Sequence, residues 1–164
     1  MYISNAGRDY WIAAMEFMAN RYSQSSTLGI VNKFIVGNEI DYTYDWYLLQ
    51  PNTDKNGKVQ RVEFNTFMEE FARTFRLANN AVKKYNASAK VLISLTHNWA
   101  QSTYDAYNVT GNHLEYNSYA PKDILDWISK YEKARGDYDW GVAAHPYPIG
   151  TTSSNPTKTD PSWS

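Results

Sequence analysis

Apolar residues along the chain recur at helical intervals in three stretches. The first predicts a helix over residues 9–22, capped by Asp9 or Ser4, whose apolar face would carry Trp11, Ala14, Met15, Met18 and Tyr22. The longest pattern covers residues 64–85 and is rich in phenylalanine. A third begins at Pro121, a residue suited to the first position of a helix, and stops at Gly136.

Between these helices lie short, strongly apolar runs at residues 33–37, 90–95 and 140–144, which are typical of buried parallel strands. Helices and strands therefore alternate, and this order predicts an α/β protein with a parallel sheet and right-handed crossovers. We find no internal repeat or domain boundary, so residues 1–164 are expected to form one unit. Residues 146–164 contain turn formers and are expected to be a mobile tail.

Composition then narrows the classes of function. The 16 basic and 17 acidic residues give a net charge of -1, so the chain lacks the basic excess expected of a nucleic-acid-binding protein. No apolar run approaches the roughly 20 residues needed to span a bilayer, and we expect no membrane partner. The absence of cysteine excludes thiolate chemistry. Aromatic residues make up 16% of the chain, mostly tyrosine and tryptophan, whose amphipathic rings suit a wet binding surface.

Polar residues suited to catalysis follow all three predicted strands. They are Asn38 and Glu39, then His97, Asn98 and Trp99, and finally His145 and Tyr147. Because the carboxyl ends of parallel strands meet at one edge of a sheet, we expect these side chains to share a rim. The two long loops, residues 38–60 and 96–120, also follow strands, which is where barrel enzymes build substrate clefts.

Two of these segments resemble a known family. The sequence Phe34-Ile-Val-Gly-Asn-Glu-Ile40 is similar to the end of strand four in the retaining (β/α)8-barrel glycoside hydrolases, where an Asn-Glu pair supplies the acid/base. The sequence His145-Pro-Tyr147 resembles the His-x-Tyr that follows strand six in several of those families. The resemblance is to the clan rather than to one enzyme. It implies that the chain supplies about strands four to six of a TIM barrel.

Carried over residue by residue, the resemblance implies roles for the strand-end residues. Glu39 would be the general acid/base, and Asn38 would bind the hydroxyl next to the reacting carbon. Tyr147 or His145 would touch the nucleophile or the sugar. His97 and Trp99 are further substrate-binding candidates without a counterpart in the clan. Trp99, Trp46 and Tyr44 are candidates for stacking on sugar rings.

The resemblance also implies a second carboxylate, which a retaining mechanism needs at about 5–5.5 Å from the first. In the clan it ends strand seven. We expect it outside this chain, because the residues after Ala144 contain several prolines and suit no further helix or strand. The chain would then be inactive alone and would pair with the remaining segments of its parent barrel or with a second copy. The substrate would be a poly- or oligosaccharide, which suggests a secreted or cell-surface parent.

Two alternatives remain open at this point. Glu39, His97 and His145 follow successive strands and could form a His₂-carboxylate site in a metal-dependent barrel enzyme. The hydrolase interpretation instead requires no cofactor and no metal. A third interpretation is a non-catalytic carbohydrate-binding or scaffold fragment, in which the aromatic residues form the working surface.

Overall fold

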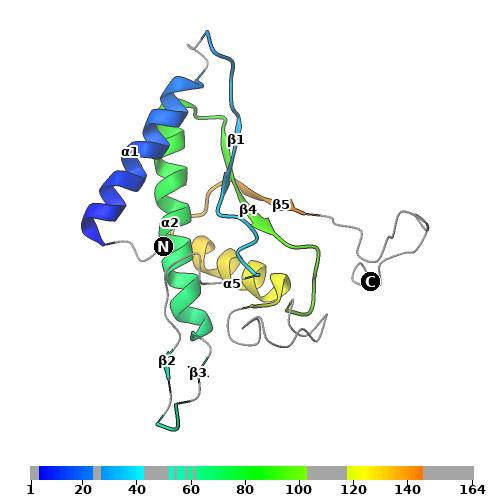
Figure 1. Ribbon diagram of the computed structural model, residues 1–164. Coiled ribbons are helices and arrows are strands. Elements are labelled where there is room, and N and C mark those ends of the chain that lie inside the picture. The colour runs from blue at the N-terminus through cyan, green and yellow to red at the C-terminus, as the bar shows by residue number, and fades with distance from the viewer. Residues whose placement is uncertain are drawn as a thin grey trace, which may run out of the picture.

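A computed structural model describes residues 4–23, 27–42, 52–53, 55–57, 59–60, 62–102 and 118–145. The elements follow one another as α1 (Asn5–Arg21), β1 (Lys33–Val36), β2 (Asn52–Thr53), β3 (Val59–Gln60), α2 (Phe64–Tyr85), β4 (Lys90–Leu95), α5 (Pro121–Lys133) and β5 (Trp140–Ala144) (Figure 1). The three helices and three strands predicted from the hydrophobic pattern are all present.

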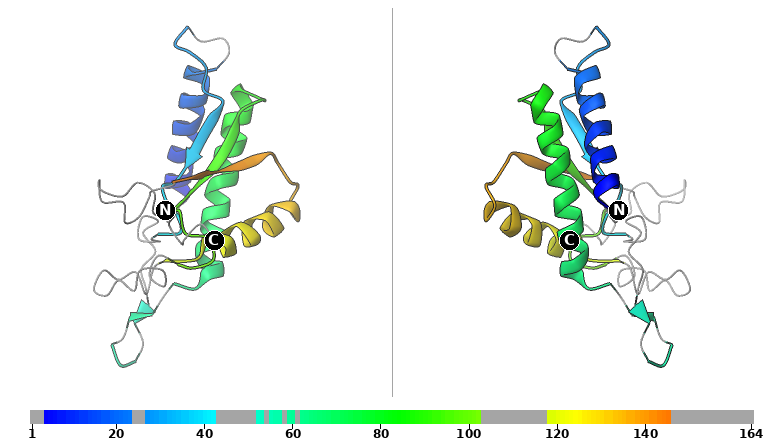
Figure 2. Two further views of the ribbon diagram at one scale, coloured as in Figure 1. Left: turned by 90° about the vertical axis from the view of Figure 1, so that its right-hand side faces the viewer. Right: turned by 90° about the vertical axis from the view of Figure 1, so that its left-hand side faces the viewer.

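Strands β1, β4 and β5 form one parallel sheet in the order β1-β4-β5, which confirms the predicted α/β class and strand direction. Helix α2 packs against the central strand β4 and is flanked by α1 and α5. Figure 2 shows from two sides that α1 and α2 lie on the same side of the strands. These three strands are compatible with part of a TIM barrel.

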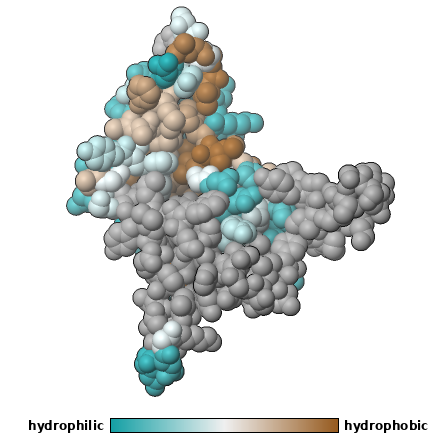
Figure 3. Space-filling view, viewed as in Figure 1, coloured by the Kyte–Doolittle hydropathy of each residue, from teal (hydrophilic) through white to brown (hydrophobic). Residues whose placement is uncertain are grey.

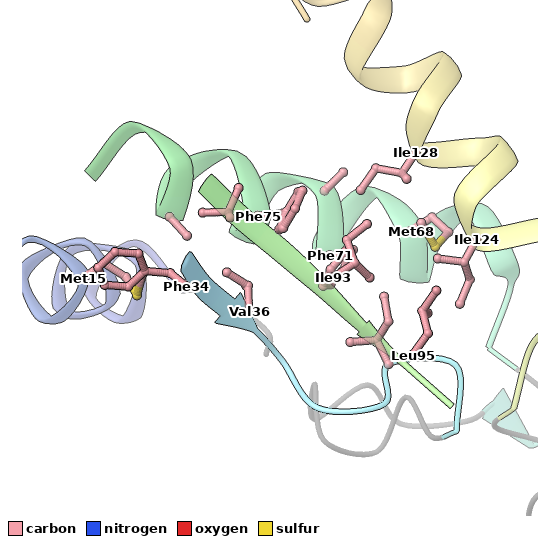
Figure 4. Close-up of a cluster of buried hydrophobic side chains, with 14 of the residues drawn as sticks. Met15, Phe34, Val36, Met68, Phe71, Phe75, Ile93, Leu95, Ile124 and Ile128 are labelled. Atoms are coloured by element: carbon pink, nitrogen blue, oxygen red, sulfur yellow. The ribbon is translucent and has the colours of Figure 1, made fainter. Parts of the chain in front are cut away.

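The core lies between α2 and the face of the sheet that is turned towards it (Figure 4). Helix α2 contributes Phe67, Phe71 and Phe75, all of them fully buried. The strands contribute every second residue, because successive side chains point to opposite faces. Each fully buried phenylalanine, isoleucine, leucine or valine side chain contributes about 1.5–3 kcal/mol to folding relative to an exposed one. The strand residues that face α2 include Phe34, Val36, Val91, Ile93 and Leu95.

The opposite face of the sheet has a different character. Ile35 and Leu92 are partners in the register and both point away from α2. Ile35 is 56% exposed, although it lies in the middle of a strand. Hydrophobic surface follows β1 and the segment that leads into it, where Leu28 and Ile30 are also exposed (Figure 3). Among the described residues, no helix covers this face.

Helix α1 differs in detail from the prediction. It begins at Asn5, and the Ser4 hydroxyl caps it by accepting the Gly7 N–H at 3.1 Å. Met15 is buried as expected, but Ala14 and Met18 are exposed, and Ala19 is buried instead. Since α1 packs mainly against α2, its buried stripe is narrow and follows the i, i+4 spacing.

The predicted loop over residues 38–60 was wrong in part. Strands β2 and β3 form a short antiparallel ladder there, joined through residues 55–57, and Gly57 adopts a positive φ of 79°. Asn56-Gly57 is a dipeptide typical of turns, but the flanking residues lack the alternating apolar pattern of strands. The predicted tail, residues 146–164, lies outside the described residues. No helix in the described part of the chain has the length and apolarity needed to cross a membrane.

Candidate functional site

The ends of β1 and β5 bring Glu39 and His145 together at the carboxyl edge of the sheet. His145 Nδ1 lies 2.9 Å from Glu39 Oε1, and the two side chains are 26% and 18% exposed. His145 is held in place by its backbone N–H, which donates to the carbonyl of Leu95 at 2.9 Å. An ionised carboxylate can only accept hydrogen bonds, so Nδ1 carries the proton when Glu39 is charged.

Ser94, in the central strand β4, connects these two residues. Its Oγ accepts the backbone N–H of Glu39 at 3.0 Å and lies 3.3 Å from His145 Nε2. In the register Ser94 pairs with Ala143 and faces away from α2, on the same face as Ile35 and Leu92. The site therefore belongs to the face that no described helix covers.

The backbone at Glu39 is strained. Its φ is +43°, the left-handed region, and it is the only described residue other than glycine with a positive φ. For a side chain with a Cβ this conformation costs roughly 1–2 kcal/mol. The turn is fixed on both sides, because Ile40 N–H donates to the Ser94 carbonyl at 3.1 Å and Tyr42 N–H donates to the Glu39 carbonyl at 2.8 Å. Such strain persists only where neighbours over-determine it, and it is common at functional sites.

Asp41, two residues after Glu39, is completely buried. Thr96, the first residue after β4, donates to it twice: the backbone N–H reaches Oδ1 at 2.8 Å, and the hydroxyl bonds Oδ2. Burial raises the pKa of Asp41 to about 6, with a smaller contribution from the charge of Glu39, while the bonds from Thr96 act in the opposite direction. The Asp41 carbonyl also accepts the N–H of Tyr119 at 2.9 Å.

The other predicted site residues lie in several environments. Asn38 is exposed beside Glu39, His97 is half-buried after β4, and Trp99 is 52% exposed. Trp46, Tyr147 and Tyr44 lie outside the described residues.

The metal-site alternative depended on Glu39, His97 and His145 converging. Within the described part of the chain, no three His, Asp or Glu side chains are arranged so that they could hold a metal ion. The described geometry thus offers no support for that alternative.

Sequence reasoning missed Ser94, Asp41 and Thr96. Ser94 was hidden inside an apolar strand, yet a lone hydroxyl in the run Val91-Leu-Ile-Ser-Leu95 is itself a signal. Asp41 belongs to no sequence motif that we could interpret, and its hydrogen bonds are with Thr96, a distant residue that follows β4.

Ser94, His145 and Glu39 follow each other in the order of a serine-hydrolase triad, with Nε2 towards the hydroxyl and Nδ1 towards the carboxylate. Ser94, however, is 0% exposed, and its Oγ already accepts the Glu39 N–H. A nucleophile must reach its substrate, so this arrangement argues against Ser94 as a nucleophile.

The fold and site define an α/β protein whose parallel sheet carries a carboxyl–imidazole pair at its carboxyl edge. The chain belongs to a family of unknown function, DUF5722, whose model matches residues 2–160. No curated protein matches it. A solved structure of a beta-glucosidase mutant derived from a hyperthermophilic tetrameric structure resembles it with a TM-score of 0.47 and 14% identity. That match covers 86% of this chain but only 28% of the other.

Proposed function

We propose that Glu39 is the general acid/base of a glycoside hydrolase that acts on a poly- or oligosaccharide. The observation that carries the proposal is the contact between Glu39 and His145 at the carboxyl edge of a parallel sheet, with the exposed Asn38 beside it. In α/β enzymes this edge is where ligands bind. The motifs at the ends of β1 and β5 point to the same chemistry.

In this mechanism Glu39 donates a proton to the glycosidic oxygen while the second carboxylate attacks the sugar carbon, and the bond to the leaving sugar breaks. Glu39 then accepts a proton from water as the water oxygen bonds to the sugar carbon and displaces the second carboxylate. His145 orients the carboxyl through its Nδ1, which lies 2.9 Å away. Asn38 would hydrogen-bond a sugar hydroxyl beside the reacting carbon. Trp99, Trp46 and Tyr147 would contact the sugar rings, and His97 their hydroxyls.

The reaction needs a second carboxylate. Asp41 is near in sequence, but it is fully buried and both of its oxygens accept hydrogen bonds from Thr96. It is therefore unsuited to attack a sugar. We propose that the second carboxylate lies outside this chain, in further sequence of the same protein.

The uncovered sheet face supports the barrel in which this chemistry would take place. Parallel sheets are normally buried on both faces, but here Ile35 is 56% exposed on the face that carries the site. In a closed barrel this face becomes the interior, which the opposite strands fill. We propose that further strands of the same barrel cover it, rather than a second copy of this chain.

The test uses the full-length protein that contains this chain, assayed on aryl glycosides and on soluble glucans, mannans and xylans. Glu39→Gln is expected to lower kcat/KM for natural glycosides by about 10²–10⁴-fold, the usual contribution of a general acid/base. The loss should be smaller for aryl glycosides with strongly acidic phenols, which need little protonation to leave. Glu69→Gln makes the same change at an exposed position of α2 and should have no effect.

Binding separates this proposal from the carbohydrate-binding scaffold. In a hydrolase, Glu39→Gln binds oligosaccharide but does not cleave it. If the wild-type protein binds oligosaccharide with no turnover of any substrate in the panel, the scaffold is favoured. If Glu39→Gln cleaves natural glycosides as fast as the wild type, Glu39 is not the acid/base.

A further inference from the structure

We propose that Asp41 and Thr96 form a clamp that positions the Glu39 carboxyl, so that Asp41 is a positioning residue of the active site. The clamp consists of the Asp41 carboxyl and the backbone N–H and hydroxyl of Thr96. This inference rests on the proposed function for its catalytic consequence, but its structural part does not. Neither residue touches substrate in this scheme.

The clamp joins the segments that follow two neighbouring strands, β1 and β4. Asp41 belongs to the turn after β1, and Thr96 is the residue after β4, 55 positions later in the chain. The Oδ1 atom of Asp41 accepts the Thr96 N–H at 2.8 Å, and Oδ2 accepts its hydroxyl. A bidentate contact of this kind fixes the direction as well as the distance of the turn.

The turn needs such a restraint because Glu39 holds a left-handed backbone, with φ at +43°. A glutamate released from its neighbours relaxes to a negative φ, which would swing its carboxyl away from His145. Ser94 restrains the turn before Asp41, through the Glu39 N–H. The clamp restrains it afterwards, and the Asp41 carbonyl adds a third tie through Tyr119.

Stability alone does not account for a carboxyl at this position. Burial raises the pKa of Asp41 to about 6, so near neutral pH the folded protein holds a charge that burial disfavours. A neutral or apolar side chain would avoid that penalty. What the carboxyl supplies is two acceptor atoms aimed at one residue of the neighbouring loop.

The test compares Asp41→Ala, Asp41→Asn and Thr96→Val in the full-length protein. Asp41→Ala removes both acceptors and should lower kcat by roughly 10–10²-fold with little change in KM, the cost expected of a misplaced catalytic group. Asp41→Asn retains an acceptor for the Thr96 N–H and should recover most of this loss. Thr96→Val removes only the hydroxyl, and its effect should lie between the two. Glu69→Gln is again the matched control.

A second readout needs no substrate. Long-range ¹H–¹⁵N spectra of the histidine rings report which nitrogen carries the proton, and His145→Gln assigns the signals among the three histidines. With the clamp intact, the spectrum should show one fixed His145 tautomer, with its Nδ1 N–H directed at Glu39. Asp41→Ala should abolish this signature, and Asp41→Asn should retain it. Circular dichroism checks that each variant is folded, and Thr96→Val serves if Asp41→Ala is not.

The outcomes separate the two proposals. If folded Asp41→Ala and Thr96→Val both keep the wild-type His145 spectrum and kcat, the clamp does not position Glu39. If Asp41→Asn loses as much as Asp41→Ala, charge rather than bonding is required, and the clamp is again wrong. If no form of the protein cleaves any glycoside but the spectra change as expected, the clamp stands and the hydrolase proposal falls.

Discussion

His145 Nδ1 lies 2.9 Å from Glu39 Oε1, although 106 positions separate the two residues in the chain. The parallel strand order β1-β4-β5 makes this possible, because each crossover returns the chain to the same edge of the sheet. The central strand adds Ser94, whose Oγ contacts both partners. The site is therefore a product of the sheet rather than of any single loop.

We predict that Asp41 makes the protein less stable as the pH rises towards neutrality. The Asp41 pKa is about 6 in the folded protein against 3.8 for an ordinary aspartate. Between these values the folded state binds more protons than the unfolded state, so the free energy of unfolding falls as the pH rises. The total loss in the free energy of unfolding is about 3 kcal/mol, at roughly 1.4 kcal/mol for each unit of pKa difference. The hydrogen bonds from Thr96 lower the Asp41 pKa and the charge of Glu39 raises it.

Urea unfolding of Asp41→Asn checks this prediction. The variant should match the wild type near about pH 4, where Asp41 is protonated in the folded state, and should exceed it by up to about 3 kcal/mol near pH 7.5. Asp126→Asn is the control, because the bond from Lys122 lowers the pKa of that exposed carboxyl. This variant should therefore lose stability relative to the wild type as the pH rises, where Asp41→Asn gains it. An Asp41→Asn variant that is less stable than the wild type at neutral pH would contradict the prediction.

The fold could be predicted from the sequence where the hydrophobic pattern was strong. The phenylalanine spacing of α2 and the apolar runs of β1 and β4 defined elements that the structure retains. The apolar face predicted for α1 was wrong in part: Ala19 is buried and Ala14 is exposed, because the contact with α2 selects one side of the helix. Strands β2 and β3 lack the alternating apolar pattern of strands, although a turn dipeptide lies between them.

The candidate site was predictable only in part, for a related reason. Strand ends identified Glu39 and His145, because residues after parallel strands must gather at one edge. The clamp between Asp41 and Thr96 depends instead on the left-handed turn at Glu39. Glutamate rarely adopts this conformation, so the sequence of the segment does not predict the turn. The role of Ser94 in holding the site together could not be read from the sequence, because its contacts are with the distant residues Glu39 and His145.

We next predict that the buried ion pair between Arg76 and Glu132 is costly to break. Glu132 on α5 is 0% exposed, and its partner Arg76 comes from α2. Arg76→Met should destabilise the protein by about 3–5 kcal/mol, because it leaves a buried carboxylate without its cation. Burial already raises the pKa of Glu132, against the opposing effect of Arg76, so the loss should shrink in acid as Glu132 takes up a proton.

The double variant Arg76→Met/Glu132→Leu separates charge from packing. It removes both charges, so it should recover most of the stability lost in Arg76→Met when both are measured by urea unfolding at neutral pH. Arg73→Met is the control, since Arg73 pairs with Glu70 on the exposed side of the same helix. Its effect should stay within about 1 kcal/mol. Equal losses for Arg73→Met and Arg76→Met would show that the buried pair has no special role.

The last prediction concerns the backbone strain at Glu39. Glycine adopts a positive φ freely, whereas alanine pays the steric cost at +43°, so Glu39→Gly should be more stable than Glu39→Ala by about 1 kcal/mol. Both variants lose the same carboxyl and its contact with His145, so their difference isolates the backbone. At Glu69, inside α2, the order should reverse, and alanine should be favoured by about 1 kcal/mol. Urea unfolding of the four variants measures both differences in the free energy of unfolding.

A preference for alanine at both positions would mean that Glu39 is not held in the left-handed turn. If glycine is favoured at position 39 but not at position 69, the glutamate at position 39 makes the protein less stable than glycine would. That is expected of a residue kept for chemistry rather than for folding.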